Sequence, residues 1–138
     1  MYYKFTFVRN PYDLLVSLYF YIKQSKNHKY HKKVKMLNFS EFLKWHISRG
    51  PLLQIDFIRD FNQETILVDR IGRFENLNQD IIKIKESIGL NCSKTELKHK
   101  NPSIIRKDKS YKEMYSDSDK SLVMEYFKTD LEYFDYNF

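Results

Sequence analysis

The hydrophobic pattern of the chain changes abruptly at Arg9. The residues before it include a short apolar, aromatic-rich run that predicts a buried strand over about residues 3–9, carried by Phe5, Phe7 and Val8. After it, Asn10 is a favourable N-cap, and Pro11 suits the first helical position, where a missing N–H costs nothing. The pattern therefore predicts a strand that passes directly into a helix beginning at about Pro11.

The next part of the chain predicts two helices with a loop between them. The first helix has apolar residues at helical spacing and fades near Asn27; these residues are Leu14, Leu15, Leu18, Tyr19 and Ile22. Residues 27–37 are polar and rich in lysine, so we expect a loop there. Asn38 and Glu41 form a capping-box pattern that begins a second helix, and Gly50-Pro51 ends it.

The middle of the chain is less regular. Residues 54–59 and 65–69 are expected to be extended around a turn, and could either pair as a hairpin or flank the main sheet. A further helix then carries one apolar stripe and ends at Gly89, which suits a left-handed C-cap; the stripe is Leu77, Ile81, Ile84 and Ile88. Residues 90–109 show no periodicity.

The C-terminal part predicts two more helices. Ser110 opens a short one and Ser116 opens the last, whose expected core stripe is Val123, Tyr126, Phe127, Leu131 and Phe134. We find no internal repeat and no sign of a second domain, so residues 1–138 are expected to form a single domain. The predicted class is α/β, with a short, mostly parallel sheet flanked by helices.

Composition supports a folded protein. Hydrophobic residues make up 42% and aromatic residues 17% of the chain, which excludes a disordered tail. No apolar run is long enough to span a bilayer and the N-terminus does not resemble a signal peptide, so we expect a cytoplasmic location. Cys92 is the single cysteine, which rules out an internal disulfide. His28 and His31 are the only candidate metal ligands, but a solvated, lysine-rich loop explains them better, so no metal is expected.

The formal charge of +6 and the pI of about 9.2 indicate anionic partners. One basic run has no acid between Asp13 and Glu41, and consists of Lys23, Lys26, Lys29, Lys32, Lys33 and Lys35. A second basic stretch lies between about residues 94 and 109. For each of them, a solvated face or mobile loop remains the alternative to a binding surface.

The junction at Arg9 is the strongest candidate for an anion site. In a parallel α/β unit, Arg9 would lie at the carboxyl end of a strand, beside a helix N-terminus that favours negative charge. Ser17 lies seven residues beyond the N-cap, on the same helix face, so Arg9 and Ser17 could approach one phosphate. The alternatives are a salt-bridged arginine and a serine that bonds to the carbonyl four residues earlier.

Three phrases of the chain also carry a resemblance to a known family. Residues 7–19 resemble the 3′-phosphate-binding segment of sulfotransferases that use 3′-phosphoadenosine 5′-phosphosulfate (PAPS). Residues 66–77 are similar to the strand-and-turn phrase of that family, and residues 130–138 are similar to its closing helix. The match looks most like the Golgi carbohydrate sulfotransferases and their bacterial relatives, beginning inside the domain, so the chain resembles an N-terminally truncated member.

The resemblance implies a partial sulfotransferase (P-loop-like) three-layer fold that runs from the 3′-phosphate-binding strand to the C-terminal helix. It implies PAPS as the sulfuryl donor and a hydroxyl of a carbohydrate or glycan as the acceptor. Arg9 and Ser17 are then the ligands of the 3′-phosphate, and Ser103 and Arg106, near His99, are expected to contact the cofactor or the acceptor. His46 falls in a context that resembles a non-catalytic helix, so we expect a satisfied or solvated histidine rather than a base.

Other features of the family are not matched. Its Lys-bearing, Gly/Thr-rich loop for the 5′-phosphosulfate and its catalytic base both precede the Arg-Asn-Pro segment, and only eight residues stand before Arg9. The three glycines are isolated, and turn and cap duties account for Gly72 and Gly89. The catalytic residues are therefore unknown, and we expect this short form to be inactive and to associate through exposed sheet edges.

Two functions of other classes remain open. One is a non-enzymatic polyanion-binding protein that holds nucleic acid or acidic glycan with residues 23–35, although the chain matches no nucleic-acid motif. The other is a catalytically dead interaction module.

Overall fold

The computed structural model describes residues 2–90, 106–107 and 109–138, which divide into two compact units. The first unit combines Met1–Arg9 with Gln54–Lys100, and the second combines Asn10–Leu53 with Asn101–Phe138. Each unit is therefore built from two separate stretches of the chain. The expectation of a single domain stays a prediction.

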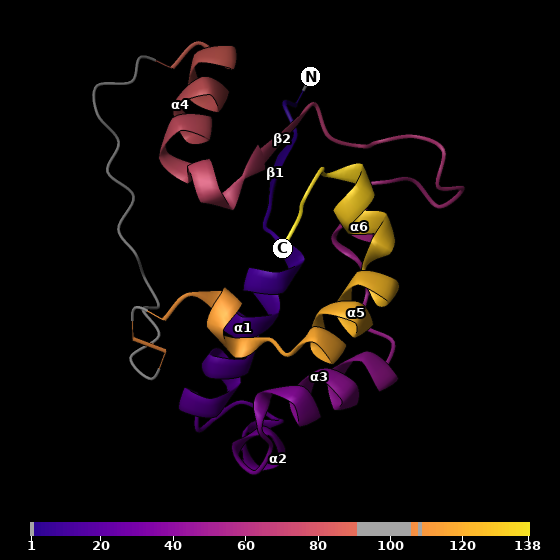
Figure 1. Ribbon diagram of the computed structural model, residues 1–138. Helices are drawn as coiled ribbons and strands as arrows, with labels where there is room; N and C mark the ends of the chain where they lie inside the picture. Colours follow the sequence, from indigo (N-terminus) through magenta and orange to yellow (C-terminus); the bar gives the residue numbers. More distant parts are fainter. Residues whose placement is uncertain (1, 91–105, 108) are drawn as a thin grey trace. The chain divides into compact units, whose positions relative to one another are not determined.

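The first unit is centred on a short parallel sheet. Strand β1 (Phe5–Val8) pairs with β2 (Arg70–Arg73), in a register that sets Phe5 against Arg70 and Val8 against Arg73. Together with the helices described below, this sheet confirms the predicted mixed α/β class (Figure 1). The expected burial of the whole strand is wrong at its start, because the side chain of Phe5 is 45% exposed whereas that of Val8 is 3% exposed.

Gly72 has a different role from the turn duty expected of it. It lies inside β2, opposite Phe7, and a Cβ atom added to it would come within 2.5 Å of Cε1 in the Phe7 ring. The missing side chain therefore makes room for an aromatic ring on the neighbouring strand.

Helix α4 (Leu77–Ser87) follows β2 through a single 3₁₀ turn, Phe74–Asn76. The Asp80 carboxylate in its first turn accepts a hydrogen bond from the Arg73 backbone N–H at 2.8 Å, which ties the helix start to the strand end. Gly89 has φ +76°, so the predicted left-handed C-cap is confirmed. The predicted apolar stripe is fully buried at Ile84 and wrong at its end, because Ile88 is 44% exposed.

The beginning of the second stretch of the first unit differs in part from the prediction. Gln54–Phe57 is a 3₁₀ helix rather than an extended segment. Beyond it the hairpin alternative is confirmed, since Arg59 and Ile66 form an antiparallel bridge and the Leu67 N–H donates to the Ile58 carbonyl at 2.7 Å.

The second unit is helical among its described residues. Its elements are α1 (Pro11–Gln24), α2 (His31–Lys35), α3 (Phe39–Ser48), the 3₁₀ helix η3 (Tyr111–Met114), α5 (Asp117–Tyr126) and α6 (Lys128–Tyr133). Helix α1 packs against α2, α3, α5 and η3, and α5 packs against α3 and α6 (Figure 1). The side chains at the centre of this packing are almost completely buried; they include Val16, Val34, Phe42, Leu43 and Val123.

Capping residues fix the starts of these helices as the sequence predicts. Asn38 and Glu41 form a complete capping box at α3, and Ser116 and Asp119 form one at α5. Ser40 donates to the Asp119 carboxylate at 2.6 Å, which links α3 to α5. Burial alone would raise the pKa of Asp119, but the hydrogen bonds from Ser40 and Ser116 outweigh it and lower that pKa.

Two predictions for this unit are wrong. Residues 27–37 are not only loop, because the turn of α2 forms where Val34 is fully buried. The last predicted helix is two helices, since Phe127 leaves helical geometry (φ −94°, ψ 17°) and stands between α5 and α6. The break leaves Tyr126 partly exposed, with its hydroxyl donating to the Pro51 carbonyl at 2.8 Å.

Candidate functional site

Arg9 follows the last residue of β1, and its backbone is held on both sides. The Arg9 N–H donates to Oε1 of Gln54 at 2.9 Å, and Nε2 of Gln54 donates to the Arg9 carbonyl at 2.8 Å. The side-chain amide of Gln54 therefore extends the pairing of β1 by one residue. Two hydrogen bonds between the same two residues fix both the position and the rotation of the backbone that carries the arginine.

The guanidinium group of Arg9 lies over an aromatic ring. Because Val8 pairs with Arg73 in a parallel register, the residues that follow them, Arg9 and Phe74, leave the sheet at the same end. The guanidinium carbon lies 4.3 Å from the centroid of the Phe74 ring. A cation–π contact of this kind holds the plane of the guanidinium against the ring. The sheet thus presents a positioned cation at its carboxyl end.

In the second unit, the start of α1 is fixed by Asn10, as predicted. The Asn10 Oδ1 accepts from the Tyr12 N–H at 3.1 Å, and its Nδ2 donates to the Asn137 carbonyl at 2.8 Å. Pro11 occupies the first helical position. The cap therefore uses both ends of the Asn10 amide, and the side chain is 8% exposed.

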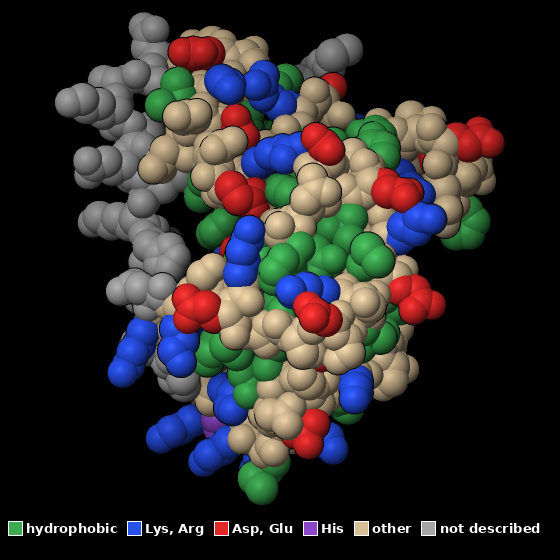
Figure 2. All heavy atoms as spheres, viewed as in Figure 1, with side chains coloured by type: hydrophobic (Ala, Val, Ile, Leu, Met, Phe, Trp, Pro, Cys, Tyr) green, Lys and Arg blue, Asp and Glu red, His purple; other side chains and the backbone are tan. Residues whose placement is uncertain are grey.

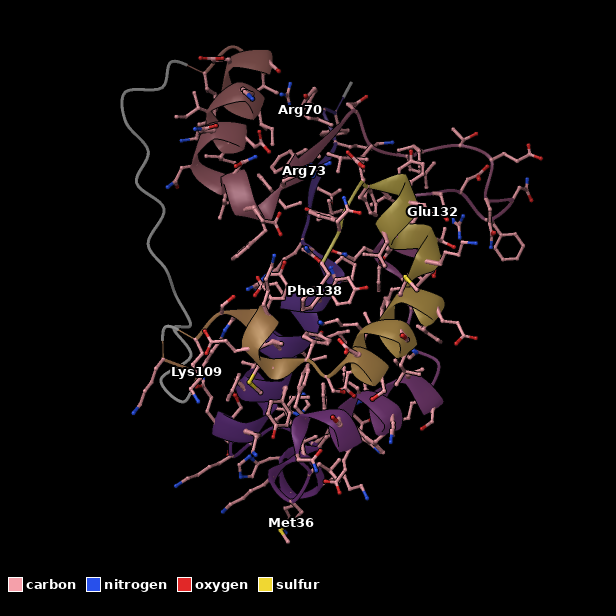
Figure 3. All side chains as sticks on the ribbon, in the orientation of Figure 1. Met36, Arg70, Arg73, Lys109, Glu132 and Phe138 are labelled. Carbon is pink, nitrogen blue, oxygen red and sulfur yellow. The ribbon has the colours of Figure 1, made fainter. Side chains whose placement is uncertain are left out.

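An aromatic cluster surrounds this helix start. The Tyr12 ring makes edge-to-face contacts with Tyr115 and with Phe138, which is labelled in Figure 3. The Tyr115 hydroxyl donates to the Tyr12 carbonyl at 2.8 Å. Burial raises the pKa of the Tyr115 hydroxyl well above its ordinary value, so the group remains a neutral donor. No local pattern singles out Tyr115, because the residue lies 103 positions from its partner.

Ser17 lies on α1 one turn beyond Asp13, and Arg106 is bound to that aspartate. Arg106 donates to Oδ1 of Asp13 at 2.7 Å, and both side chains are less than one-fifth exposed. Residues four apart on a helix share a face, so Ser17 lies on the same face of α1 as Asp13, the residue that Arg106 contacts. The Ser17 hydroxyl makes no hydrogen bond with another described residue, and the alternative of a bond to the carbonyl four residues earlier is therefore not realised.

The four predicted cofactor ligands thus have different outcomes. Arg9 is described in the first unit, and Ser17 and Arg106 in the second, so the binding of one phosphate by Arg9 and Ser17 stays a prediction. Arg106 is paired with the Asp13 carboxylate, a contact that the sequence does not predict. Ser103 and the neighbouring His99 lie outside the described residues.

His46, which we expected to be satisfied or solvated, is more constrained than that. Its ring stacks on Phe42 with centroids 5.4 Å apart, and its Nδ1 is buried without a hydrogen-bond partner in the described part of the chain. Burial, helped by the charge of Arg49, lowers the pKa of His46 below its ordinary value of 6.5. The imidazole is therefore neutral at neutral pH.

The other two histidines of the second unit, His28 and His31, contact backbone groups through their Nδ1 atoms. Nδ1 of His31 lies 3.0 Å from the Ile22 carbonyl, and Nδ1 of His28 accepts from the Tyr30 N–H at 3.2 Å. Within residues 2–90, 106–107 and 109–138 no cluster of three or more His, Cys, Asp or Glu side chains could hold a metal ion. No helix in this same part of the chain is both long and apolar enough to cross a membrane.

Comparison with known proteins assigns the chain to a family. Over 87 residues it is 36% identical to an uncharacterised protein of Archaeoglobus fulgidus, and the matched part covers 62% of this chain and 67% of that protein. No solved structure matches the chain. A family model described as "Sulfotransferase family" matches residues 1–137, which is nearly the whole length. The chain therefore belongs to the sulfotransferase family.

Proposed function

We propose that this protein takes part in the transfer of a sulfuryl group from PAPS to a hydroxyl of a carbohydrate. Membership of the sulfotransferase family supports sulfuryl transfer, and the donor and acceptor are the finer parts of the proposal. The observation that carries it is Arg9, a cation held by Gln54 and Phe74 at the carboxyl end of a parallel strand. The next residue in the chain caps a helix, and a strand end followed by a helix start is a common site for phosphate groups.

The residues present fit the 3′-phosphate of PAPS. The Arg9 guanidinium can only donate hydrogen bonds, and the Ser17 hydroxyl can either donate or accept one. The oxygens of a phosphate group are acceptors, so both side chains can donate to it. In this proposal Arg9 supplies the charge-assisted bonds and Ser17 a neutral one, while Ser103 and Arg106 contribute to binding of the donor. PAPS itself would supply the activated sulfuryl group.

The role proposed for Arg9 and Ser17 is binding and orientation. The 3′-phosphate is remote from the sulfur atom at which bonds form and break, so contacts to it stabilise the ground and transition states about equally. Their loss should therefore weaken donor binding while changing the rate of the transfer step little.

The test of this proposal is calorimetry with adenosine 3′,5′-bisphosphate. Arg9→Ala should weaken binding by about 1.5–3 kcal/mol, the range for a charge-assisted hydrogen bond, or roughly 10- to 150-fold. Ser17→Ala should weaken it by less. The matched control is Arg70→Ala, which removes the same charge from the first unit. Arg70 pairs with Phe5, at the end of the sheet opposite to Val8 and Arg9.

A second ligand sharpens the result. Adenosine 5′-monophosphate lacks the 3′-phosphate, so its affinity should be weak and the same in the wild type and in Arg9→Ala. Equal affinity of adenosine 3′,5′-bisphosphate for both proteins would remove Arg9 from the site. The acceptor class is tested separately by titration, and saturable binding of a tyrosine-containing peptide but not of a glycan would contradict the carbohydrate part of the proposal.

A further inference from the structure

Six exposed cations gather around α2 in the second unit. They are Lys26, Lys29, Lys32, Lys33, Lys35 and Arg49, and we name them the α2 basic patch. Figure 2 shows Lys and Arg side chains on the end of this unit that carries α2, and Figure 3 shows Met36 at its tip. None of the six belongs to the residues proposed to hold the donor.

The patch is carried by packed structure and not by a free loop. Val34 is fully buried, which fixes the rotation of α2 and directs Lys32, two residues earlier, to the opposite side. His31 adds a contact from its Nδ1 to the Ile22 carbonyl of α1 at 3.0 Å. The lysines of α2 are therefore carried by a packed helical turn, unlike the mobile loop that the sequence left open as an alternative.

The positive charge of the patch is not neutralised by described residues. No carboxylate of the described chain lies within 4.0 Å of any of its six cationic groups. Lys23, the first lysine of the run, is different, because its amine donates to the Tyr19 hydroxyl at 2.9 Å and so lies apart from the patch. Six like charges on one surface repel one another, and an anionic partner would relieve that repulsion.

Aromatic rings build the edge of the patch around Arg49. Its guanidinium carbon lies 4.1 Å from the centroid of Tyr30 and 4.9 Å from that of Trp45, and it also donates to the Tyr30 hydroxyl. The amine of Lys29 lies 4.7 Å from the Tyr30 centroid. Cations thus already occupy these rings, whereas single-stranded nucleic acid is usually held by bases that stack on free rings. The arrangement favours recognition of anionic groups.

We propose that the α2 basic patch docks an anionic polysaccharide, one whose sulfate or carboxylate groups bind the lysines and Arg49. The positive charge of the patch is observed independently of any function, but the choice of a polysaccharide over another polyanion rests on the proposed carbohydrate sulfotransferase function. A repeating polymer suits several lysines spread over a loop and a helical turn, since each sugar unit can present a further anionic group.

Trp45 makes the proposal directly measurable. It is the single tryptophan of the chain and it contacts Arg49, so its fluorescence reports from one known position at the edge of the patch. Titration with a heparin oligosaccharide should change the emission of Trp45 and saturate. If the lysines Lys29, Lys32 and Lys33 release about three counterions, raising salt from about 50 to about 200 mM should weaken binding roughly 60-fold.

Neutralising variants separate the patch from net charge. Replacing Lys29, Lys32 and Lys33 together with glutamine should weaken binding at low salt at least tenfold and flatten the salt dependence. The matched control replaces Lys4, Lys83 and Lys128 with glutamine, which removes the same charge elsewhere and should leave binding within about twofold. Equal loss in both triple variants, or no binding by the wild type, would overturn the proposal.

Other polyanions complete the test. Tighter binding of duplex DNA, or of vesicles containing phosphatidylserine, that depends on the same three lysines would assign the patch to that partner and overturn the polysaccharide. Adenosine 3′,5′-bisphosphate is measured in parallel. Its binding without that of heparin would reject the docking surface alone, whereas heparin binding with no effect of Arg9→Ala on the nucleotide would reject the proposed donor site alone.

Discussion

The contact between Gln54 and the backbone of Arg9 gives the most specific prediction. Gln54→Ala removes two hydrogen bonds, of 2.9 and 2.8 Å. A typical hydrogen bond contributes about 0.5–1.5 kcal/mol net, so the variant should lose about 1–3 kcal/mol of unfolding free energy. Because the same bonds position Arg9, the affinity for adenosine 3′,5′-bisphosphate should also fall, though by less than in Arg9→Ala.

A double-mutant cycle tests whether Gln54 acts through Arg9. Calorimetry is carried out on the wild type, Gln54→Ala, Arg9→Ala and the double variant, and urea unfolding on the same four proteins. Once the guanidinium is gone, removal of Gln54 should cost stability but no further nucleotide affinity. The control is Gln79→Ala, at an exposed position of α4 in the same unit.

Two results would refute the reasoning. If Gln54→Ala has the stability and affinity of Gln79→Ala, the two hydrogen bonds do not position Arg9. If Gln54→Ala lowers affinity equally with and without the Arg9 side chain, Gln54 contacts the ligand itself or changes the protein more widely.

Three further predictions concern stability. Gly72→Ala should lower the unfolding free energy by about 1–3 kcal/mol in urea, because its new methyl group collides with the ring of Phe7, and a neutral result would show that the ring moves freely. Asn10→Ala should cost about 1–2 kcal/mol through loss of the α1 cap, whereas Asn10→Ser, which keeps a capping oxygen and loses only the donation to Asn137, should retain more of the stability; equal losses would reject the capping role. The lowered pKa of His46 means that the unfolded chain binds a proton at this residue more readily than the folded protein, so the unfolding free energy should fall as pH decreases from about 6.5 toward the folded pKa and level off below it. Urea unfolding at about pH 7.5 and about pH 5.5 should show a smaller loss of unfolding free energy in His46→Gln than in the wild type. An equal loss in both proteins would contradict the assignment.

The sequence predicts the start of α1 well because its chemistry is local. Asn10 and Pro11 satisfy and replace N–H groups of the same helix turn, so no distant part of the chain is needed. The same holds for the cap at Asn38 and the end of α4 at Gly89. The phrase around Arg9 likewise pointed to the family that the comparison then showed.

The features that the sequence missed depend on distant residues. Helix α2 contains one buried apolar side chain, Val34, which cannot create a periodic pattern by itself. The pairing of Arg106 with Asp13 joins residues 93 positions apart, and the contact of Gln54 with Arg9 joins residues 45 apart. A side-chain amide that pairs with a backbone has no spacing rule, so only the structure reveals it.

The pairing of β1 with β2 also has a consequence for how the chain folds. The register joins Phe5 to Arg70, which are 65 positions apart, and the chain between them includes α1, α2 and α3 of the other unit. Closing a loop of that length costs roughly 4 kcal/mol of chain entropy before any strand contact compensates it. Local helices form much sooner than such distant strand pairs, so the helices of the second unit should be protected from hydrogen exchange earlier in refolding than the sheet. Since each unit is interrupted by the other, no single cut of the chain yields either of them by itself, and a ribosome must release residues beyond Arg73 before the first unit can begin to close.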